Sequence, residues 1–395
     1  MLFVDAAIPL GAAWSSPFAR WQGSLADVNS LDLAAQVTRD ALARATIPLD
    51  ELSEIIVGMT TPQHESFYAA PTVAARVGAP TITGPLITQA CATSVACVHA
   101  AASAADDRTV VLVVTTDRIS NSPLVVYPAP GAPGGTPEVE RWTLDAFARD
   151  PWGGMSMVDT AEAVAKEAGI ERSELDDVTL IRHAQYEDAL ADDRSFQREW
   201  MVPAIVARRR GDPLVLELDE GIAATTEEGL AKLRPAAPDG VVTFGTQTHP
   251  ADGTAGMIVT STARAAELSG GRGTARLLAT GFARVEAGRM PRATVPAART
   301  ALDAAGLTID DVDVVKTHNP FAVNDIYFAR EMGVAIEGMN PFGCSLVYGH
   351  PQGPTGARGI TELLACLVRR GGGVGLFTGC AAGDSGAALL VRVDG

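Results

Sequence analysis

The sequence predicts an α/β protein whose core consists of two similar halves. Runs of β-branched residues alternate with segments of helical period, which is typical of sheets covered by helices. A helix-to-strand unit occurs twice, as ALARATIPLDEL at 41–52 leading into EIIVGM and as ALDAAGLTIDDV at 301–312 leading into VDVVKT. The two copies share Ala, Leu, Ala and Asp at one constant offset. Chance similarity of Ala-rich helices is the alternative to duplication.

The elements that follow occur in the same order in both halves, which favours duplication. Each predicted strand is a short apolar or β-branched run, and the predicted helices are rich in small residues that let helices and sheets approach closely. In the first half we expect a strand at 85–88, a helix at 91–105 and a strand at 109–116. In the second half we expect a helix at 355–369 and a strand at 373–378.

The segment between the halves is interpreted as an inserted loop domain. It contains the loop-forming sequence YPAPGAPGGTPE, two predicted helices at 159–168 and 172–191, and the basic run Arg208–Arg210. The predicted organisation is the N-terminal half of the core at 1–119, the insertion at 120–239, the end of the N-terminal half at 240–262 and the C-terminal half at 263–395.

The composition is that of a globular protein and excludes several classes of function. Of 395 residues, 47% are hydrophobic and 20% are charged, and the net charge of −16 argues against a nucleic-acid-binding or anionic-membrane-binding role. None of the lysines follows a glycine, so a GxxxxGK phosphate-binding loop is absent. No apolar run approaches the ~18 residues of a membrane span. The start MLFVDAAIPL lacks a basic segment, so we expect a cytoplasmic protein.

The side chains available for thiol or imidazole chemistry are five cysteines and six histidines. The odd cysteine number, the wide spacing and the lack of a CxxC pair argue against a disulfide framework and a zinc site, so we expect free thiols and no metal. Several of these residues are assigned to packing or to the surface: Cys97, Cys344 and Cys366 as packed residues, His64 and His249 as loop residues, and His183 as a residue of an exposed helix.

Cys91 is a candidate nucleophile. It lies in ITQACATSVACVHAA, directly after a predicted strand and at the start of a predicted helix. The free N–H groups and the dipole of a helix N-terminus favour the thiolate and lower a thiol pKa. A buried structural cysteine is the alternative.

His350 and Cys380 are candidate partners of this thiol. His350 lies in GHPQGPTGAR, a glycine- and proline-rich loop that opens a helix, where an imidazole can accept a thiol proton. The alternative is a loop histidine that caps the helix or faces solvent. Cys380 lies in FTGCAAGDSG, where the last predicted strand ends in a tight turn. A second thiol there would act as acid and base, and the alternative is a small residue packed at a strand end.

Three segments in this order resemble the thiolase family: QACATS, GHPQGPTGAR and GCAAG. The resemblance covers essentially the whole chain and implies a duplicated, five-layered αβαβα core with an inserted loop domain that binds CoA. By this resemblance Cys91 is the acyl-accepting nucleophile, His350 the base that activates it, and Cys380 the acid and base at the α-carbon or the leaving CoA thiol. CoA and acyl-CoA are then substrates, no cofactor is held covalently, and a homodimer or homotetramer is expected.

The oxyanion sites that the resemblance implies depart from the commonest family pattern. His318 in HNPF stands where many thiolases have asparagine. The sterol-carrier-type branch of the family also has histidine at this position. An imidazole N–H can still donate to a thioester oxygen. A strand-end histidine without a role is the alternative. The other site uses the backbone N–H groups of Cys91 and Ala382, with Ala382 at a position that is usually glycine.

The implied substrate contacts also differ from the family pattern. Ser156 and Thr248 replace residues near the pantetheine and can still bond an amide, and Met157 and Phe321 are assigned to the same substrate site. Ala223 stands where an arginine near the CoA nucleotide is expected, and Arg208–Arg210 is the candidate replacement.

Two other functions remain open at this point. A ketosynthase-like condensing enzyme pairs one cysteine with two histidines, and the set of Cys91, His318 and His350 is present. A non-catalytic acyl-CoA-binding or lipid-binding homologue would retain the fold without turnover, which the altered His318 segment and the missing arginine favour.

Overall fold

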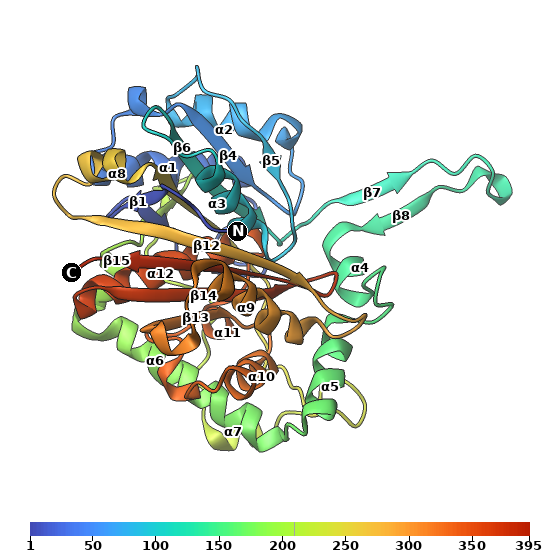
Figure 1. The fold of residues 1–395 in the computed structure, drawn as a ribbon. Helices are drawn as coiled ribbons and strands as arrows, with labels where there is room; N and C mark the ends of the chain where they lie inside the picture. Colours follow the sequence, from blue (N-terminus) through green and yellow to red (C-terminus); the bar gives the residue numbers. More distant parts are fainter. Residues whose placement is uncertain (209) are drawn as a thin grey trace.

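The computed structural model describes residues 1–208 and 210–395 and centres on an 11-stranded mixed sheet (Figure 1). The strand order is β13-β14-β15-β12-β1-β11-β6-β4-β5, with β2 and β3 also paired to β11. The strands are β1 (Ala7–Pro9), β2 (Ala13–Ser15), β3 (Ala19–Arg20), β4 (Glu54–Gly58), β5 (Leu86–Ile87), β6 (Val110–Arg118), β11 (Ala251–Thr260), β12 (Thr274–Arg284), β13 (Val314–His318), β14 (Gly373–Ala381) and β15 (Ser385–Val393). Strand β1 pairs antiparallel with both β11 and β12, so it joins the two halves of the sheet.

Helices cover the two half-sheets in layers, as the resemblance implied. Helices α3 (Thr93–Ser103) and α12 (Gly353–Arg370) lie in the middle and contact each other and strands of both halves. Helices α1 (Ser30–Ala45) and α2 (Ala69–Val77) cover the N-terminal half, and α9 (Thr294–Ala305) and α10 (Ala322–Met332) lie on the opposite outer side (Figure 1). Helix α8 (Thr262–Leu268) packs on β1 at the edge of these layers.

The duplication predicted from the sequence is present in the structure. Helix α1, the 3₁₀ turn Leu49–Glu51 and β4 have their counterparts in α9, the 3₁₀ turn Ile309–Asp311 and β13. Both helices end at a residue in the left-handed region, Thr46 with φ 62° and Gly306 with φ 66°. The second unit repeats as well, because α3 leads into β6 just as α12 leads into β14. The two central helices therefore begin at the same end of the molecule and bring two loops together there.

Close approach of the central helices depends on a small residue. A Cβ atom on Gly356 would lie 2.9 Å from Cβ of Ser94, which real Cβ atoms do not tolerate. The hydroxyl of Ser94 donates to the carbonyl of Gly353 in the first turn of α12. The loops that precede α3 and α12 are held together in this way.

The inserted segment leaves the sheet after β6 and returns at β11. Its strands β7 (Leu124–Tyr127) and β8 (Glu138–Arg141) form a hairpin that projects from the body of the molecule (Figure 1). Its other elements are α4 (Trp142–Ala148), α5 (Met157–Ala168), α6 (Arg172–Arg198), β9 (Ala204–Val206), β10 (Leu214–Leu216) and α7 (Glu227–Ala231), with a 3₁₀ turn at Pro133–Gly135. Elsewhere in the chain, 3₁₀ turns lie at Ser66–Tyr68, Met290–Ala293 and Ile336–Gly338, and the short α11 (Ser345–Tyr348) precedes α12. Non-helical residues at 191–194 interrupt α6, where the predicted helix ends.

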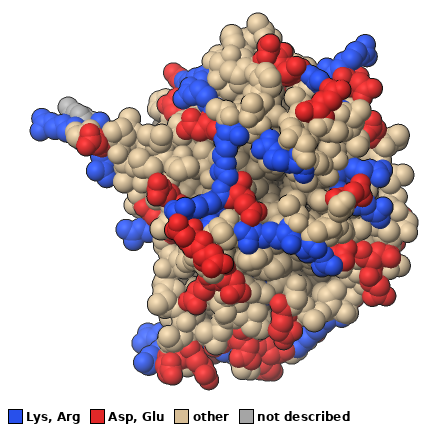
Figure 2. Space-filling model, turned by 90° about the vertical axis from the view of Figure 1, so that its left-hand side faces the viewer, with Lys and Arg blue, Asp and Glu red and all other residues tan. Residues whose placement is uncertain are grey.

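The charges of the surface are mixed. Figure 2 shows acidic and basic side chains interspersed on one face. The described basic side chains form no continuous surface on this face. Among the described residues no helix is long and apolar enough to cross a bilayer. Of the basic run Arg208–Arg210, Arg209 lies outside the described residues.

Candidate active site

Cys91 lies in a tight turn between β5 and α3. The turn is strained, because Ala90 has φ 45°, in the left-handed region that disfavours a residue with a Cβ. Helix α3 begins at Thr93 with Ala92 as its N-cap, so the predicted helix start at residue 91 is two residues too early. Cys91 therefore precedes the helix and is half-buried.

The thiol pKa of Cys91 differs from the sequence-based expectation. Burial raises the pKa of Cys91 to about 12, against the opposing effect of the backbone N–H groups of Ala382 and of Cys91 itself. The buried carboxyl of Asp117 raises it further. The expected lowering by the helix N-terminus is therefore wrong, because the desolvation of a thiolate in this pocket outweighs the dipole. Cys91 is a neutral thiol in the resting protein.

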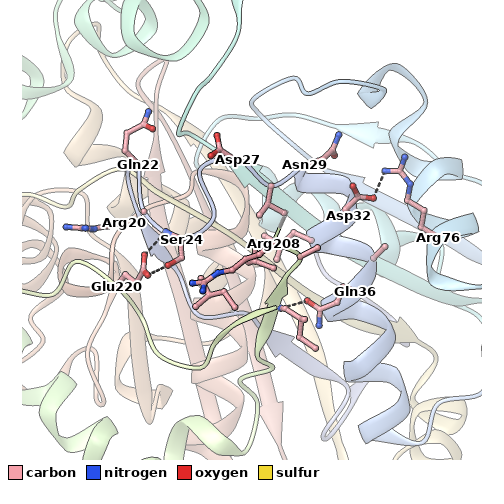
Figure 3. Close-up of a pocket in the computed structure, with 18 of the residues that line it drawn as sticks. Arg20, Gln22, Ser24, Asp27, Asn29, Asp32, Gln36, Arg76, Arg208 and Glu220 are labelled. Carbon is pink, nitrogen blue, oxygen red and sulfur yellow. Dashed lines mark hydrogen bonds and ion pairs between the residues drawn. The ribbon is translucent and has the colours of Figure 1, made fainter. Parts of the chain in front are cut away.

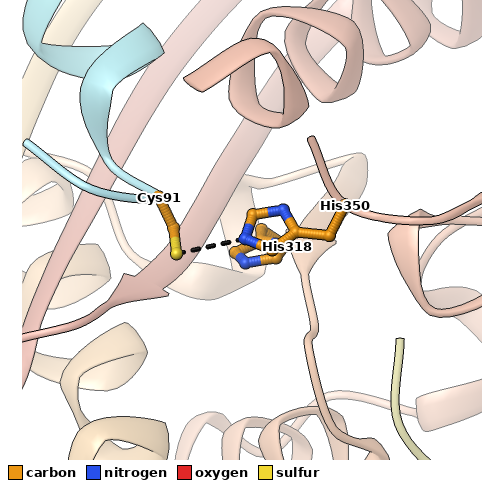
Figure 4. A group of neighbouring side chains, drawn as sticks. All are labelled: Cys91, His318 and His350. Carbon is orange, nitrogen blue, oxygen red and sulfur yellow. Dashed lines mark hydrogen bonds between the residues drawn. The ribbon is translucent and has the colours of Figure 1, made fainter. Parts of the chain in front are cut away.

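His350 lies against this thiol. Its Nε2 is 3.1 Å from Cys91 Sγ (Figure 4), and its Nδ1 is 2.6 Å from Oγ1 of Thr355 in the first turn of α12. Burial and the nearby imidazoles lower the pKa of His350 well below its ordinary value, so the ring is neutral. With Nδ1–H donating to Thr355, the lone pair of Nε2 faces the thiol proton. This is the geometry of a base that accepts a proton from Cys91.

Gln352 completes this pair and was not predicted. Its Oε1 lies 3.1 Å from Cys91 Sγ, and the residue is buried with φ 62° and ψ −102°. A hydrogen bond to Gln352 raises the pKa of His350, against the effect of burial. The amide oxygen is therefore placed to stabilise the imidazolium that forms when Cys91 transfers its proton. In the sequence, the only signal for Gln352 was a polar residue inside a glycine-rich loop.

A neutral thiol–imidazole pair predicts slow alkylation at neutral pH. We expect the second-order rate of Cys91 with iodoacetamide to rise about tenfold per pH unit from pH 7 to 10, because the thiolate fraction grows toward a pKa of about 12. Mass spectrometry of the Cys91 peptide measures the rate. A rate that is already constant above pH 6 would identify a preformed thiolate–imidazolium pair and contradict this prediction.

His318 is stacked on His350. It ends β13, which runs parallel to β14, and its ring centroid lies 4.1 Å from that of His350 at an interplanar angle of 28°. A Cβ on Gly379 of β14 would lie 2.8 Å from His318 Cβ, so only glycine leaves room for this ring. Burial lowers the pKa of His318 to about 3, which keeps the imidazole neutral. Cys91, His318 and His350 offer ligand atoms within 4.8 Å of one another.

Ser345 determines whether His318 Nε2 carries a proton or a lone pair. The sequence did not predict this residue. His318 Nδ1 lies 2.9 Å from Ser345 Oγ, and His318 Nε2 is buried without a partner among the described residues. When the hydroxyl donates to Nδ1, the proton lies on Nε2 and is available to an oxygen in the cavity. When the hydroxyl donates instead to Oδ1 of Asn319, 3.4 Å away, Nε2 presents a lone pair. Asn319 is fixed in turn by Asp325, which pairs with the buried Arg182.

Removing the hydroxyl of Ser345 is expected to slow condensation without slowing acylation of Cys91. In Ser345→Ala we expect acylation of Cys91 by acyl-CoA to be retained and condensation to slow about tenfold, the equivalent of one lost neutral hydrogen bond. Rapid-quench measurement of acyl-enzyme and product separates the two steps. Ser345→Thr, which retains the hydroxyl, is the control. Equal slowing of both steps in the alanine variant would show a merely structural role.

Cys380 lies within β14 rather than in the following turn, because the strand extends to Ala381 and not to residue 378 as predicted. Its side chain is buried and receives a hydrogen bond from Asn324 Nδ2 at 3.2 Å. Burial raises the pKa of Cys380, repulsion from a thiolate on Cys91 would raise it further, and the bond from Asn324 opposes this. Asn324 is a third residue that was not predicted. Its Nδ2 is placed to stabilise a thiolate on Cys380.

A cavity of about 290 Å³ opens onto Cys91 and His350. Four residues assigned to the site from the sequence line it as well: Met157, Thr248, Phe321 and Ala382. Ala382 has no left-handed φ, so its side chain is tolerated where glycine is usual. The hydroxyl of Thr248 donates to the carbonyl of Ser345. His318 and Cys380 are not among the described residues that line it.

Ser156 is not among the described residues that line this cavity, and its assignment as a substrate contact stays a prediction. It is the N-cap of α5, where its hydroxyl donates to Asp159 at 2.7 Å and accepts from the Asp159 N–H. This capping box satisfies the free N–H groups of the helix start. The hydroxyl is thereby occupied inside the helix terminus.

Arg208 lines a separate cavity of about 1010 Å³ (Figure 3). That cavity is bordered by charged and polar side chains, among them Arg20 and Glu220, and shares no lining residue with the cavity at Cys91. The structure therefore gives no support to Arg208 as a replacement for the missing arginine at the active-site cavity.

The remaining cysteines and histidines are distributed mostly as expected. Cys97, Cys344 and Cys366 are buried and free. His64 is exposed in a loop. His183 is half-buried, with Nε2 3.2 Å from Thr225 Oγ1, so its predicted exposure is wrong because the segment after β10 covers α6.

Comparison with known proteins agrees with this fold and site. The thiolase N-terminal domain model matches residues 11–263, and the thiolase C-terminal domain model matches residues 272–393. An acetyl-CoA acetyltransferase of Chromobacterium violaceum is 32% identical over 98% of this chain and 99% of the relative. A beta-ketoadipyl-CoA thiolase of Acinetobacter baylyi is 29% identical over 95% of this chain and 97% of the relative.

Solved structures show the same fold. The acetyl-CoA acetyltransferase of Bacillus anthracis superposes with a TM-score of 0.91 at 28% identity and covers 99% of both chains. Human mitochondrial 3-ketoacyl-CoA thiolase in complex with CoA superposes with a TM-score of 0.89 at 25% identity over 100% of both chains. The duplicated core and the paired cysteine and histidine define a class of acyl-transferring α/β proteins. Within that class, the chain belongs to the thiolase family.

Proposed function

We propose that this chain is an active thiolase that transfers acyl groups between Cys91 and CoA. The observation that carries the proposal is the 3.1 Å contact between Cys91 Sγ and His350 Nε2 at a cavity that also holds the N–H of Ala382. A thiol, a neutral base and an oxyanion donor at one cavity are the parts that thioester exchange requires.

In thiolysis the thiol of Cys91 attacks the 3-keto carbon of a 3-ketoacyl-CoA, and its proton passes to His350 Nε2. The oxyanion is stabilised by the N–H groups of Cys91 and Ala382. The bond between C2 and C3 then breaks, leaving acyl-Cys91 and a CoA-bound carbanion, which takes a proton from Cys380. CoA finally attacks acyl-Cys91: its thiol proton passes to the Cys380 thiolate, the departing Cys91 thiolate takes back the proton held by His350, and a shortened acyl-CoA leaves.

In the condensing direction the same groups act in reverse. Cys380 removes a proton from the α-carbon of a second acyl-CoA, and Asn324 Nδ2, 3.2 Å from its sulfur, stabilises the thiolate. The carbanion attacks the carbonyl of acyl-Cys91. A proton on His318 Nε2 can stabilise the enolate oxygen, a role that Ser345 supports through Nδ1. One fixed donor of this kind is typically worth about 3 kcal/mol.

We also propose that the inserted segment holds the CoA part of the substrate. Phe147 and Met157 of the inserted segment line the cavity together with Phe321, the N-cap of α10, and Phe244, which is 78% exposed, lies at its border. An apolar wall with few polar groups suits a pantetheine arm. The match to a thiolase structure that contains CoA supports this placement.

A ketosynthase-like condensing enzyme is the second candidate, because the ligand atoms of Cys91, His318 and His350 lie within 4.8 Å of one another. Such an enzyme would not need Cys380. A non-catalytic homologue would bind acyl-CoA without turnover. Consumption of CoA with a panel of 3-ketoacyl-CoAs, and release of CoA from acyl-CoAs, test the proposal: thiolysis supports it, condensation without thiolysis supports the second candidate, and binding without either reaction supports the third.

We further propose that the protein is a cytoplasmic homo-oligomer in which the β7–β8 hairpin contacts a second copy. The hairpin exposes apolar side chains, with Val126 57% and Val139 54% exposed, which a monomer would leave in water. We expect Val126→Glu to lower the mass measured by light scattering, from a tetramer to a dimer or from a dimer to a monomer. Glu138→Gln in the same hairpin is the control, and an unchanged mass in Val126→Glu would exclude this contact.

A further inference from the structure

Three side chains at the active site form a set of ligands that no sequence spacing revealed. Cys91, His318 and His350 come from separate segments, and their ligand atoms lie within 4.8 Å of one another (Figure 4). One thiol and two neutral imidazoles are ligands that Zn²⁺ prefers. We propose that the resting active site binds one Zn²⁺ ion through these three side chains and that the bound ion reversibly blocks acyl transfer.

His318 carries the strongest evidence for such a site. Its ring is 1% exposed, and its Nε2 is buried without a partner among the residues that the structure describes. A buried polar atom without a partner is costly, and a bound ion removes the cost. The ring is held from the other side by Ser345, whose hydroxyl can accept from Nδ1–H and so leave the lone pair on Nε2.

His350 is held in the same manner. Its Nδ1 lies 2.6 Å from Thr355 Oγ1, so Nε2 presents its lone pair beside Cys91 Sγ. Both imidazoles therefore have the outer hydrogen-bond partner that fixes the ring of a metal-ligating histidine. Gln352 Oε1, 3.1 Å from Cys91 Sγ, offers an oxygen for the fourth position, which water can fill instead.

Binding requires the side chains to adjust: the stacked rings of His318 and His350 have to turn apart so that both Nε2 lone pairs converge on one ion. Sulfur and nitrogen ligands of a tetrahedral Zn²⁺ ion lie about 3.5 Å apart, given bond lengths of about 2.3 and 2.0 Å. Cys91 Sγ and His350 Nε2 are 3.1 Å apart, so the thiol has to move outward by less than its own radius. The cavity of about 290 Å³ that borders both residues provides the entry path.

Binding exchanges a proton for the ion. The Cys91 thiol loses its proton to solvent, the sulfur forms a bond to Zn²⁺, and nothing is oxidised or reduced. An acylated Cys91 has no thiolate to offer, so acyl donors and Zn²⁺ compete for the same sulfur. The inhibition, unlike the binding, rests on the proposed acyl-transfer function.

The test uses the full-length protein after chelator treatment, with zinc chloride alone as the probe. Calorimetry in two buffers of different protonation enthalpy is expected to show one Zn²⁺ per chain, about one proton released, and a dissociation constant of about 1 µM or tighter. In His318→Asn the dissociation constant is expected to rise at least ~100-fold, since loss of an outer partner alone costs up to that much. His64→Ala, an exposed histidine, is the matched control and is expected to bind unchanged.

The outcomes separate the zinc site from the proposed function. Binding that is unchanged in both His318→Asn and Cys91→Ser, or that releases no proton, overturns the zinc site. Acylation of Cys91 together with a failure to bind Zn²⁺ also overturns it and leaves the proposed function standing. Zn²⁺ binding that depends on Cys91 and His318, without any acylation of Cys91, supports the site and overturns the function.

Discussion

Cys91→Ala is expected to abolish acyl transfer and to remove the acyl mass that acyl-CoA adds to the protein. Loss of a nucleophile that acts together with its base typically costs roughly 10⁴-fold or more in turnover. The physical reason is specific to this pocket: the thiol that His350 Nε2 contacts at 3.1 Å is the one reactive group on the cavity wall that can form a thioester. Mass spectrometry of tryptic peptides after incubation with acyl-CoA locates the label.

Cys97→Ala is the matched control for this experiment. Cys97 lies on helix α3, which begins just after Cys91, but is buried at 0% exposure and has no imidazole partner among the described hydrogen bonds. We expect the control to retain both the label on Cys91 and turnover, at some cost in stability from the small cavity. An acyl label on the Cys97 peptide of the wild-type protein would contradict the assignment of Cys91.

The local sequence predicted that Cys91, His350 and Cys380 lie near the ends of helices or strands, as they do, but it predicted the pKa shift of Cys91 in the wrong direction. The segments around Cys91, His350 and Cys380 identify element ends, and such ends depend on nearby glycine, proline and apolar patterns. The pKa of Cys91 depends instead on its folded surroundings: burial raises it, and the backbone N–H of Ala382, far away in the sequence, lowers it. Desolvation of this kind has no local signature, so the predicted direction of the shift was wrong.

The residues that hydrogen-bond to the site residues also differ in whether a local sequence pattern predicts them. Ser345 and Asn324 contact the site only because β13, β14 and α10 bring their segments together, so no local pattern predicts them. Ser156 is the opposite case. The sequence SMVD is a readable capping box, and this signal would have placed the Ser156 hydroxyl in a helix terminus.

The duplicated core explains why the site needs both halves. Helix α3 comes from the first half and α12 from the second, and their N-terminal ends meet because Ser94 contacts the first turn of α12. Each half alone offers an incomplete set: the first supplies Cys91, and the second supplies the imidazoles and Cys380. The repeat was visible in the sequence, whereas the contact between its two copies is a property of the folded core.

Cys380→Ser is expected to separate the two chemical stages of the reaction. Acylation of Cys91 should be retained, because His350 and the N–H of Ala382 do not depend on Cys380. Condensation and thiolysis should fall by about 10²- to 10⁴-fold, the usual contribution of a positioned acid and base, because serine is a far weaker acid than a thiol. The measurement is acyl-enzyme formation by mass spectrometry beside CoA consumption by a thiol reagent.

A substitution of Asn324 tests the same stage as Cys380→Ser. Asn324→Asp would place a carboxylate where Nδ2 now donates to Cys380 Sγ at 3.2 Å, so the thiolate would lose its donor and face a negative charge. The same stage should therefore slow, and acylation of Cys91 should again persist. Full turnover in Cys380→Ser would show that carbanion chemistry proceeds without the second thiol. In that case the pair His318 and His350, stacked 4.1 Å apart, would carry the reaction in the manner of a one-cysteine condensing enzyme.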